Sequence, residues 1–477
     1  MPARLPEIRA RLERHRQAHL LACFERLDER GQTALLDQIE AINFDELDEL
    51  IQTLVLKRPA QSVCPSIEPA TFYPHDPTDP RRVWDAAAAR AAGDQLLRGG
   101  KVAAFTVAGG QGTRLGWNGP KGTFPATVVT GKPLFRVFAE QIVAARSRYG
   151  ISIPWYIMTS PLNDAETRAF FADNNWFGLP MEDVFTFPQG TMPSIGLDGR
   201  LLLAGPGEIA TNPDGHGGSI KALRTSGAIE HMAARGIEVI SYFQVDNPLV
   251  RIFDPVFLGL HTSAADSSGE MSSKMVPKAS PQERVGVFCR IDGRTTVLEY
   301  SDLPENLAAQ RDEHGRLRFD AGSIAIHAIG VGFVERLTAD RDHFGLPFHR
   351  ADKKVSWYDP AVDRVVEPEA PNAVKLETFV FDAIPLARSS IVYETSRVEE
   401  FAPIKNAQGQ DSAQSSFQLQ SDRAGRWLAR HGVDIPTTIE GHVDARIEIS
   451  PLTALGAEDL AGQKLPRSVA RGGQLVL

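Results

Sequence analysis

The chain has 477 residues, of which 42% are hydrophobic and 23% charged, and its formal net charge is −9. These values are typical of a globular protein of about two to four domains. The acidic balance excludes a broad electrostatic grip on nucleic acid or an anionic membrane, so an anionic ligand must be met by locally placed cations. No apolar run approaches the roughly 18 residues that span a bilayer, and the charged N-terminus does not resemble a signal peptide. We expect a soluble, cytoplasmic protein.

The sequence holds three cysteines, Cys23, Cys64 and Cys289, which lie far apart and show no CxxC spacing. An odd and sparse set argues against a disulfide framework and against a structural zinc site. We therefore expect reduced thiols packed inside the protein.

Residues 1–98 are expected to form a mainly helical accessory domain. Apolar residues recur at helical spacing within residues 1–57, which indicates two or three amphipathic helices. Residues 58–80 are rich in Pro, Ser and Thr and are typical of an extended connection. An alanine-rich helix follows and ends at the pair Gly99–Gly100, which suits a helix C-terminus.

After this helix, strands, loops and helices alternate, and this order predicts an α/β domain with a mixed, mostly parallel sheet over residues 99–400. The β-branched run at 102–107 predicts a buried strand, and another strand is expected over residues 237–246. Asn163, with Glu166 three residues later, resembles a capped helix start.

Two further segments are expected to contain antiparallel strands. Residues 285–300 hold two strand-like runs around Asp292–Gly293, the favoured two-residue hairpin turn. The last part of residues 401–477 alternates apolar and polar residues with a period of two, broken by Gly and Pro. We expect residues 401–477 to form a small, mainly β C-terminal domain.

The most informative segment is the glycine-rich loop AGGQGTRLGWNGPKGTFP at residues 108–125, directly after a predicted strand. Glycines let backbone N–H groups approach phosphate oxygens closely because no Cβ intervenes. The loop contains no Walker A string, and the third glycine of a dinucleotide fingerprint would fall on Leu115. Because the loop carries two cations, Arg114 and Lys121, it predicts a phosphate site rather than a structural turn.

With these residues in view, the chain resembles the eukaryotic-type UDP-sugar pyrophosphorylases, and among them the UDP-N-acetylglucosamine pyrophosphorylases. The resemblance covers roughly residues 100–410 and rests on an ordered series of motifs. These are GGQGTRLG and PKG in the loop, then FPQG, NPDGHGG, QVDN, RVGVFCRIDGRTTVLEYSDL, DAGSIAIH, LPFHRADKK, VKLETFVFD and FAPIKNA. It implies a Rossmann-like nucleotidyltransferase core between smaller N- and C-terminal domains, and a reaction that depends on Mg²⁺.

The resemblance also implies which residues meet the phosphates and the metal. Arg114 and Lys121 are expected to contact the triphosphate, and Lys405 in PIKN the sugar phosphate. Asp246 ends a predicted strand, where open α/β sheets bind ligands, and its carboxylate is a suitable Mg²⁺ ligand. By spacing alone, Asp246 could instead be a turn residue and Lys405 an ordinary surface lysine.

For the uracil base, the resemblance implies the backbone of residues 108–110 (Ala108, Gly109 and Gly110), the backbone of Gly215 and the side chain of Gln189. Uracil presents one N–H donor between two carbonyl acceptors. An amide side chain together with backbone groups is therefore a chemically sensible reader.

Gly286, Glu299, Ser323 and His216 match positions that lie near the sugar in the family, although Glu299 could also be an exposed strand residue. Two departures from the N-acetylglucosamine pattern occur there. His216 stands where an asparagine is usual, and the UDP-glucose enzymes tend to have histidine. Ser323 and Ile326 replace the two asparagines of NIAN. These changes put the identity of the sugar in doubt but leave the uridylyl chemistry intact.

We therefore expect a uridylyltransferase that joins UTP to a sugar 1-phosphate, with N-acetylglucosamine 1-phosphate first and glucose 1-phosphate or a broad hexose range as alternatives. A non-catalytic UDP-sugar binder of the same fold is the rival from another class, but it should lack the cations or the carboxylate. A nicotinamide oxidoreductase fits poorly because the fingerprint fails. The charged N-terminal helices could also suit an interaction scaffold, although a solvated accessory domain is simpler.

Overall fold

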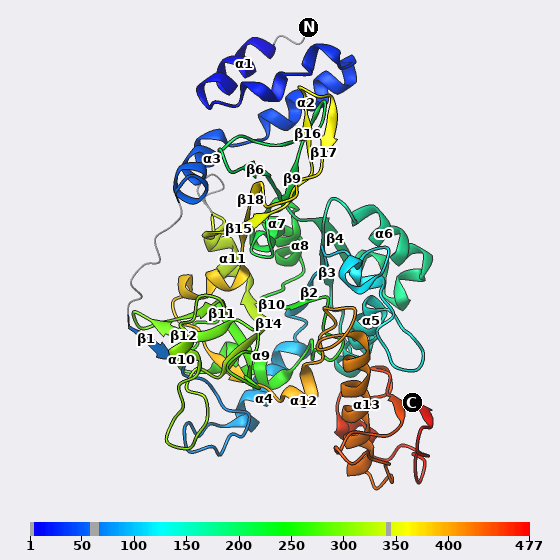
Figure 1. Cartoon of the computed structure of the whole chain (residues 1–477). Coiled ribbons are helices and arrows are strands. Elements are labelled where there is room, and N and C mark those ends of the chain that lie inside the picture. The colour runs from blue at the N-terminus through cyan, green and yellow to red at the C-terminus, as the bar shows by residue number, and fades with distance from the viewer. Residues whose placement is uncertain (1–3, 58–65, 340–344) are drawn as a thin grey trace. The chain divides into compact units, whose positions relative to one another are not determined.

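The computed structural model describes residues 4–57, 66–339 and 345–477. Contacts divide the chain into two compact units (Figure 1). Unit 1 combines residues 1–65, 190–218 and 345–380, and unit 2 combines residues 66–189, 219–344 and 381–477. The predicted division at residues 98 and 400 remains a prediction, whereas the mixed α/β fold class is confirmed.

Unit 1 packs amphipathic helices against short antiparallel strands. Its longer helices are α1 (Leu5–Arg14), α2 (Glu29–Glu40) and α3 (Phe44–Leu50). Its strands are β5 (Thr191–Pro193), β6 (Ile195–Gly196), β7 (Leu203–Gly205), β8 (Glu208–Ile209), β9 (Thr211–Pro213), β15 (Phe348–Lys353), β16 (Trp357–Asp359), β17 (Arg364–Val366) and β18 (Ala373–Thr378). Leu12 and Leu36 of the helices share one buried core with Leu203 and Leu376 of the strands. The expected N-terminal helices are therefore confirmed.

Unit 2 is built on a ten-stranded mixed sheet, counted over the described residues, with the path β1-β12-β14-β10-β2-β3-β4. The strands are β1 (Ile67–Pro69), β2 (Val102–Val107), β3 (Trp155–Thr159), β4 (Val184–Pro188), β10 (Val239–Gln244), β11 (Met271–Pro277), β12 (Val287–Ile291), β13 (Arg294–Leu298), β14 (Ala321–Gly330) and β19 (Val392–Glu394). Strands β10, β2, β3 and β4 pair in parallel, whereas β14 is antiparallel to β10, β11 and β12. The carboxyl ends of four neighbouring strands thus meet at one edge, the usual ligand side of such sheets.

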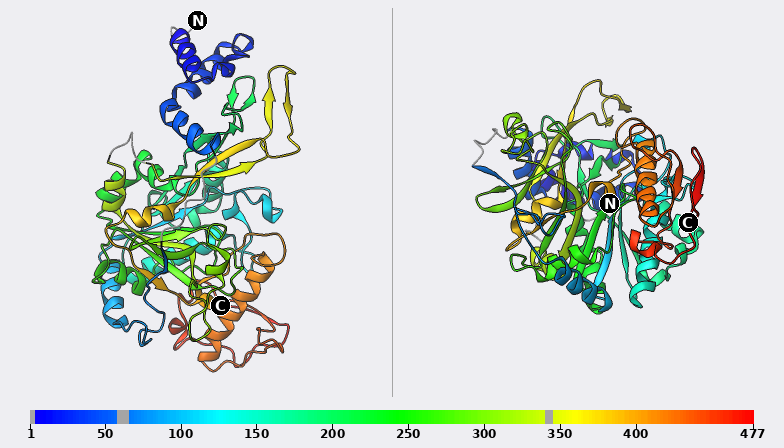
Figure 2. Two further views of the ribbon diagram at one scale, coloured as in Figure 1. Left: turned by 60° about the vertical axis from the view of Figure 1, so that its left-hand side comes forward. Right: turned by 90° about the horizontal axis from the view of Figure 1, so that it is seen from below.

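Helices cover both faces of this sheet (Figures 1 and 2). The helices of unit 2 are α4 (Ala86–Arg98), α5 (Leu134–Tyr149), α6 (Asp164–Asp173), α7 (Gly218–Thr225), α8 (Ala228–Ala234), α9 (Pro255–Ser263), α10 (Glu305–Ala308), α11 (Val331–Leu337), α12 (Arg397–Glu400) and α13 (Ala413–Arg430), of which α13 packs on the C-terminal strands instead. The core beneath them is apolar and aromatic; Phe135, Phe138, Trp155 and Phe243 are fully buried. The predicted hairpin is also present, because Asp292 and Gly293 both have positive φ angles of 50° and 78°, as a type I′ turn requires.

Residues 401–477 contain the longest helix, α13, which was not among the predicted elements, and a two-stranded sheet of β20 (Arg446–Glu448) and β21 (Gln474–Val476). Leu428 of α13 and Ile447 of β20 share a small buried core. This segment is also bonded to the rest of unit 2, because Glu448 accepts hydrogen bonds from the backbone N–H groups of Val129 and Thr130 at 3.0 and 2.8 Å.

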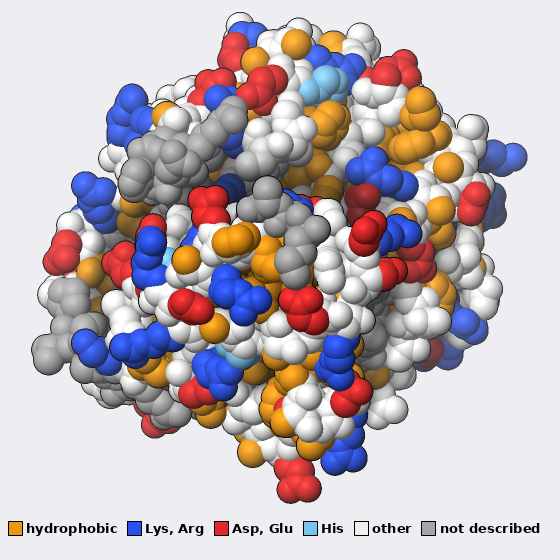
Figure 3. All heavy atoms as spheres, turned by 90° about the horizontal axis from the view of Figure 1, so that it is seen from above, with side chains coloured by type: hydrophobic (Ala, Val, Ile, Leu, Met, Phe, Trp, Pro, Cys, Tyr) orange, Lys and Arg blue, Asp and Glu red, His pale blue; other side chains and the backbone are white. Residues whose placement is uncertain are grey.

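Several expectations from composition can be compared with the structure. Within residues 4–57, 66–339 and 345–477, no helix is both long enough and apolar enough to cross a bilayer. On the face drawn in Figure 3, Lys and Arg side chains are interspersed with Asp and Glu, without a broad field of one sign. Cys23 and Cys289 are buried and form no disulfide within the described part of the chain, whereas Cys64 lies outside it.

Candidate active site

The glycine-rich loop begins where β2 ends and is held in place by its neighbours in the sheet. The N–H of Ala108 donates to Met158 O on β3 at 2.8 Å, and the N–H of Lys121 donates to Gly110 O at 3.0 Å, which closes the loop. Asn163 supports the same turn, because its Nδ2 donates to Ala108 O at 3.1 Å and to Gly110 O at 3.4 Å.

The helix start predicted at Asn163 is confirmed, because α6 begins at Asp164, but the predicted side-chain cap is absent. The Asn163 side chain makes no capping hydrogen bond to α6. Its Oδ1 instead accepts from the N–H of Ser160 at 2.7 Å, while its Nδ2 faces the glycine loop. A buried amide can satisfy either task, and only the approach of β2 to β3 decides which backbone groups lie within its reach.

The residues predicted to read the base in unit 2 come together at the ends of β2 and β4. Gln189 follows β4 and is buried, and its backbone N–H donates to Thr159 O at 2.9 Å. A Cβ added at Gly109 would stand 2.4 Å from Gln189 Oε1, so the glycine backbone and the amide are in direct contact. Space is open beside Gly110, where an added Cβ would meet nothing within 4 Å. An amide and exposed backbone groups are thus presented side by side.

The predicted phosphate cations and the predicted metal ligand also converge. Lys121 Nζ lies 3.9 Å from Asp246 Oδ2 at the end of β10. Burial lowers the pKa of Lys121, Asp246 opposes that shift, and the nearby charges of Lys405 and Arg114 lower the pKa further. Asp246 O accepts from the N–H of Ile404 at 2.8 Å, which places the Lys405 loop beside β10. Three cations and one carboxylate therefore occupy one end of the sheet.

Asp411 belongs to this group, and the sequence analysis did not single it out. Its backbone carbonyl accepts from the N–H groups of Lys405 and Asn406 at 2.6 and 3.0 Å. Burial raises the pKa of the Asp411 carboxyl; the Lys405 charge opposes this shift, and Asp246 and Glu283 add to it. Asp411 stands in a loop without a recognisable motif, so no spacing in the sequence links it to Asp246.

The donor set at this edge fits a hard cation such as Mg²⁺. Asp246 and Asp411 supply carboxylate oxygens, the charge of Asp246 adds to the raised pKa of Asp411, and a bound cation would offset this negative charge. Among the described residues, no group of three or more His, Cys, Asp or Glu side chains is placed to hold a metal ion. An ion here would take its remaining ligands from phosphate oxygens and water, as Mg²⁺ commonly does.

Three of the four residues predicted to lie near the sugar are neighbours: Gly286 directly precedes β12, Glu299 directly follows β13, and Ser323 lies on β14. The N–H of Ser323 donates to Gly286 O at 2.8 Å. A Cβ added at Gly286 would lie 3.7 Å from Glu299 Oε1 and only 2.8 Å from Val297 Cγ1. The hairpin thus folds the Glu299 carboxylate back over Gly286.

Gly215 and His216 belong to unit 1, whereas the other predicted site residues belong to unit 2. Gly215 has a φ of +88°, and a Cβ there would stand 2.3 Å from Thr378 O, so the turn requires glycine. His216 stacks on Phe379 with ring centroids 5.2 Å apart, and its Nδ1 accepts from the N–H of Val380 at 3.1 Å. Burial lowers the pKa of His216 to about 4, so the imidazole is neutral at pH 7 and its proton lies on Nε2.

Comparison with known proteins follows this geometry. The family described as UTP–glucose-1-phosphate uridylyltransferase matches residues 70–428. A UDP-N-acetylhexosamine pyrophosphorylase-like protein 1 from Xenopus tropicalis is 34% identical, over 97% of this chain and 94% of that protein. UDP-N-acetylglucosamine diphosphorylase 2 from Arabidopsis thaliana is 32% identical, over 94% of this chain and 90% of that protein.

Among solved structures, the uridine diphosphate N-acetylglucosamine pyrophosphorylase from Trypanosoma brucei, crystallised with an inhibitor, is similar over the whole length. The two share 26% identity with a TM-score of 0.80, and the match covers 100% of this chain and 98% of that one. The Rossmann-like fold expected from the motifs is therefore confirmed, whereas the role of each site residue remains a prediction.

Proposed function

Because the chain belongs to the UTP–glucose-1-phosphate uridylyltransferase family, we propose that it transfers the uridylyl group of UTP to N-acetylglucosamine 1-phosphate. The products would be UDP-N-acetylglucosamine and pyrophosphate. The observation that carries this proposal is the placement of Lys121 3.9 Å from Asp246, with the charges of Lys405 and Arg114 close by. A triphosphate needs such locally placed cations in a chain of net charge −9.

In the proposed reaction, a phosphate oxygen of the sugar 1-phosphate attacks the α-phosphorus of UTP in line. The bond from that phosphorus to the bridging oxygen breaks, and pyrophosphate leaves with the electron pair. Lys121 and Arg114 would hold the triphosphate, and Lys405 the attacking phosphate, so that catalysis comes from positioning and charge stabilisation. Asp246, with Asp411 beside it, would hold Mg²⁺, which would neutralise phosphate charge.

N-acetylglucosamine is favoured as the sugar because the Arabidopsis relative is named for it, at 32% identity. Three residues at the expected sugar site do not favour N-acetylglucosamine, since His216, Ser323 and Ile326 replace the asparagines of that pattern. Glu299 is a suitable acceptor for paired sugar hydroxyls in either case. UDP-glucose formation and a broad sugar range are therefore the alternatives to be tested.

We also infer that the reaction takes place in the cytoplasm.

The decisive experiment measures pyrophosphate release from UTP and Mg²⁺ with the 1-phosphates of N-acetylglucosamine, N-acetylgalactosamine, glucose and galactose in turn. We expect N-acetylglucosamine 1-phosphate to give the highest kcat/KM. A higher value for glucose 1-phosphate would overturn the assigned sugar but keep the reaction class. Protein that binds UTP and yet releases no pyrophosphate with any of them would instead be a non-catalytic UDP-sugar binder.

The variant His216→Asn with Ser323→Asn restores two of the asparagines that the family pattern carries. If these positions contact the sugar, the ratio of kcat/KM for N-acetylglucosamine 1-phosphate over glucose 1-phosphate should rise by about tenfold, which is on the order of 1.4 kcal/mol. The double variant His261→Asn with Ser272→Asn makes similar changes at two buried side chains that bond to each other, so it is the matched control and should leave the ratio unchanged.

A further inference from the structure

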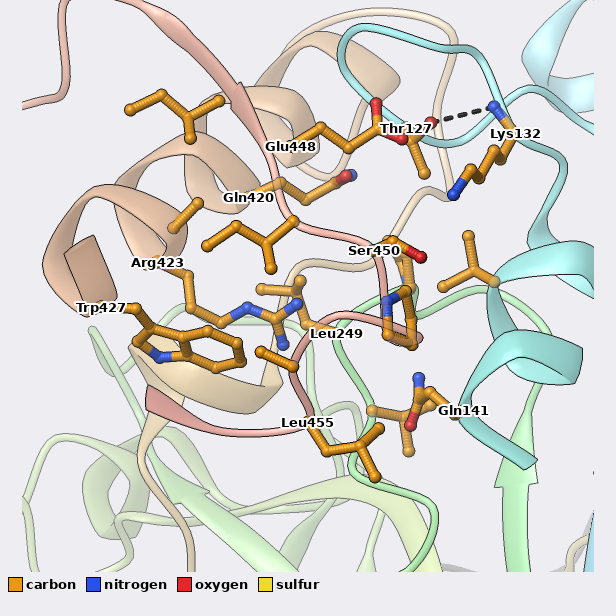
Figure 4. A pocket seen from close by; sticks show the side chains of 18 of the residues that line it. Thr127, Lys132, Gln141, Leu249, Gln420, Arg423, Trp427, Glu448, Ser450 and Leu455 are labelled. Carbon is orange, nitrogen blue, oxygen red and sulfur yellow. Dashed lines mark hydrogen bonds between the residues drawn. The ribbon is translucent and has the colours of Figure 1, made fainter. Parts of the chain in front are cut away.

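A cavity lies in unit 2 between α5, the segment after β10, and the C-terminal residues (Figure 4). Its volume is about 50 Å³. The lining includes Gln141 of α5, Leu249, Gln420 and Trp427 of α13, and Ser450. None of the residues assigned to UTP or sugar lines it, so this cavity is separate from the candidate active site.

Arg423 projects its guanidinium from α13 toward the middle of this cavity (Figure 4). Its Nη1 makes a long hydrogen bond of 3.3 Å to Glu399 O, and its carbon Cζ lies 4.8 Å from the Trp427 ring centroid. A guanidinium has five N–H donors, and the geometry of the described residues shows a partner for only one of those of Arg423. Four donors therefore face the cavity or its solvent.

Arg251 brings a second guanidinium to the same cavity from the segment after β10. Its Nε lies 3.9 Å from Glu400 Oε1, beyond hydrogen-bond distance. Burial lowers the pKa of Arg251, but Asp254 and Glu400 outweigh that effect and raise it overall. Burial, the largest cause, lowers the pKa of Arg423 to about 10; the charge of Glu399 opposes this shift, and the charge of Arg251 adds to it.

The surrounding carboxylates are already occupied by other partners. Glu400 binds the fully buried Lys274 at 2.6 Å, and Asp254 binds the same ammonium at 2.7 Å. Glu399 Oε1 accepts from Arg426 Nε at 3.1 Å, and its Oε2 accepts from Trp427 Nε1 at 2.7 Å.

Glu448, which also lines the cavity, turns its carboxylate toward the backbone of Val129 and Thr130. Glu458 is within 3.8 Å of Arg90. The Arg423 charge is thus left without a carboxylate of its own among the described residues that surround it.

We propose that this cavity is a binding site for a phosphate-class anion, held between the guanidinium groups of Arg423 and Arg251. A partly buried cation without a paired carboxylate favours an anionic ligand, and a guanidinium binds phosphate oxygens with paired N–H groups. A water molecule needs roughly 10–15 Å³ of such volume, so the cavity has room for a few waters or for one small oxyanion. The anion is either free orthophosphate or the phosphate group of a small organic phosphate.

An anion in this cavity would bind two segments that continue into the candidate active site. Asn247, next to Asp246, donates from Nδ2 to Glu400 O at 2.6 Å and accepts from the N–H of Ala402 at 3.1 Å. The N–H of Ile404 then donates to Asp246 O at 2.8 Å. Arg251 lies on the same segment as Asn247, and Arg423 bonds to Glu399 O next to Glu400, so an anion between the two arginines would link the same two segments.

The test is isothermal titration of the full chain with orthophosphate, at constant ionic strength maintained with chloride. We compare the wild type with Arg423→Gln and with Arg426→Gln, a matched control three residues further along α13 whose guanidinium is paired with Glu399. We expect the wild type and Arg426→Gln to bind with similar Kd, and Arg423→Gln to bind at least tenfold more weakly. Any binding of phosphate at the candidate active site should be the same in all three proteins, so it does not affect the comparison of their Kd values.

Equal binding by Arg423→Gln and Arg426→Gln, or no binding by the wild type, would overturn the proposal. The variant Arg423→Lys controls for misfolding of Arg423→Gln, because it keeps the positive charge but loses the paired N–H groups. Its Kd for phosphate should lie between that of the wild type and that of Arg423→Gln. Glycerol phosphate distinguishes the two sources of phosphate. If glycerol phosphate binds more tightly than orthophosphate, the ligand is an organic phosphate; if it binds more weakly, the ligand is the free ion.

Discussion

The surroundings of Lys121 have opposing effects on its pKa. Burial and the charges of Lys405 and Arg114 favour its neutral form, while Asp246 at 3.9 Å favours the ammonium. A triphosphate bound beside these cations would supply the missing negative charge, so the site would bind its anion partly by relieving repulsion among its own groups. This is a local arrangement that a single substitution can test.

The variant Lys121→Ala should lower kcat/KM by about 10²–10³, because each lost charge contact removes on the order of 2–4 kcal/mol of transition-state stabilisation. Pyrophosphate release measures the rate, and circular dichroism with Tm checks that the fold is unchanged. Lys101→Ala is the matched control, since Lys101 is exposed and pairs only with Glu238 at 2.6 Å. Near wild-type activity in Lys121→Ala would remove this lysine from the mechanism.

His216 should make the stability of the protein depend on pH. The pKa of His216 is about 4 in the folded protein, against an ordinary value of 6.5. Between these two pH values the imidazole is protonated in the unfolded chain but neutral in the folded chain. The free energy of unfolding should therefore fall as the pH is lowered, with a contribution of about 2 kcal/mol between pH 7 and pH 5.

Urea unfolding at these two pH values measures the effect, and His216→Asn should reduce the difference by that amount. The exposed His314→Asn is the control and should follow the wild type. An unchanged difference in His216→Asn would mean that the imidazole is not held neutral.

Among the elements, α4 and α9 are in backbone contact through small residues. A Cβ added at Gly93 would stand 1.8 Å from Pro255 O, and one at Gly259 would stand 1.7 Å from Ala89 O. Neither helix can retreat without disturbing the sheet beneath, because Leu97 of α4 and Phe257 of α9 are buried in the main core.

We predict that Gly259→Ala lowers the free energy of unfolding by about 1–3 kcal/mol or more, since the added methyl group must push backbone aside. Gly332→Ala in α11 is the matched control, because an added Cβ there meets nothing within 4 Å and alanine favours a helix. Chemical denaturation of both variants gives the comparison. A loss no larger in Gly259→Ala than in Gly332→Ala would contradict the tight contact.

Lys274 joins three elements through charge. It lies on β11, is fully buried, and binds Asp254 at the start of α9 and Glu400 of α12 at 2.7 and 2.6 Å. Replacing it with methionine would leave two carboxylates without their ammonium, at a cost of about 3–5 kcal/mol. We expect Lys274→Met to lose that much stability in urea, and Lys101→Met, at an exposed ion pair, to lose less than about 1 kcal/mol. A small loss in Lys274→Met would show that the carboxylates find other partners.

At the scale of the whole molecule, the chain forms two units, each with its own buried core. Unit 1 is assembled from three separate stretches of sequence, so its integrity depends on long-range contacts. Gln17 shows this, because its Nε2 donates to Gly199 O at 3.0 Å and its Oε1 accepts from the N–H of Leu201 at 2.9 Å.

Native-state hydrogen exchange should therefore sort the protected amides into two groups. We expect peptides from residues 4–57, 190–218 and 345–380 to open together, at a lower free energy than the strands β2, β3 and β10 of the central sheet. Mass spectrometry of peptic fragments resolves these segments. Three different opening free energies within unit 1 would contradict a single cooperative unit.

A large part of the fold could be predicted from sequence. The strand at 102–107, the glycine loop after it and the turn at Asp292–Gly293 each depend on residues that are adjacent in the chain. Helix α13 was missed for a physical reason: most of its buried face is made of small and polar residues, such as Ser416, Gln420 and Ala424, and its large buried apolar side chains, Trp427 and Leu428, stand together near its end. Large apolar residues confined to one turn leave no hydrophobic period to detect along the helix.

The sequence by itself determined the family, the mixed α/β fold and the set of charged and glycine residues around Lys121 and Asp246, because motifs are local strings whose chemistry does not need the fold. Only the tertiary structure decided that Asn163 supports the glycine loop, that Asp411 faces Lys405, and that Arg423 meets Arg251 across a cavity. These contacts join residues far apart in the chain, and their energies depend on burial and on distance in space, neither of which spacing along the sequence encodes.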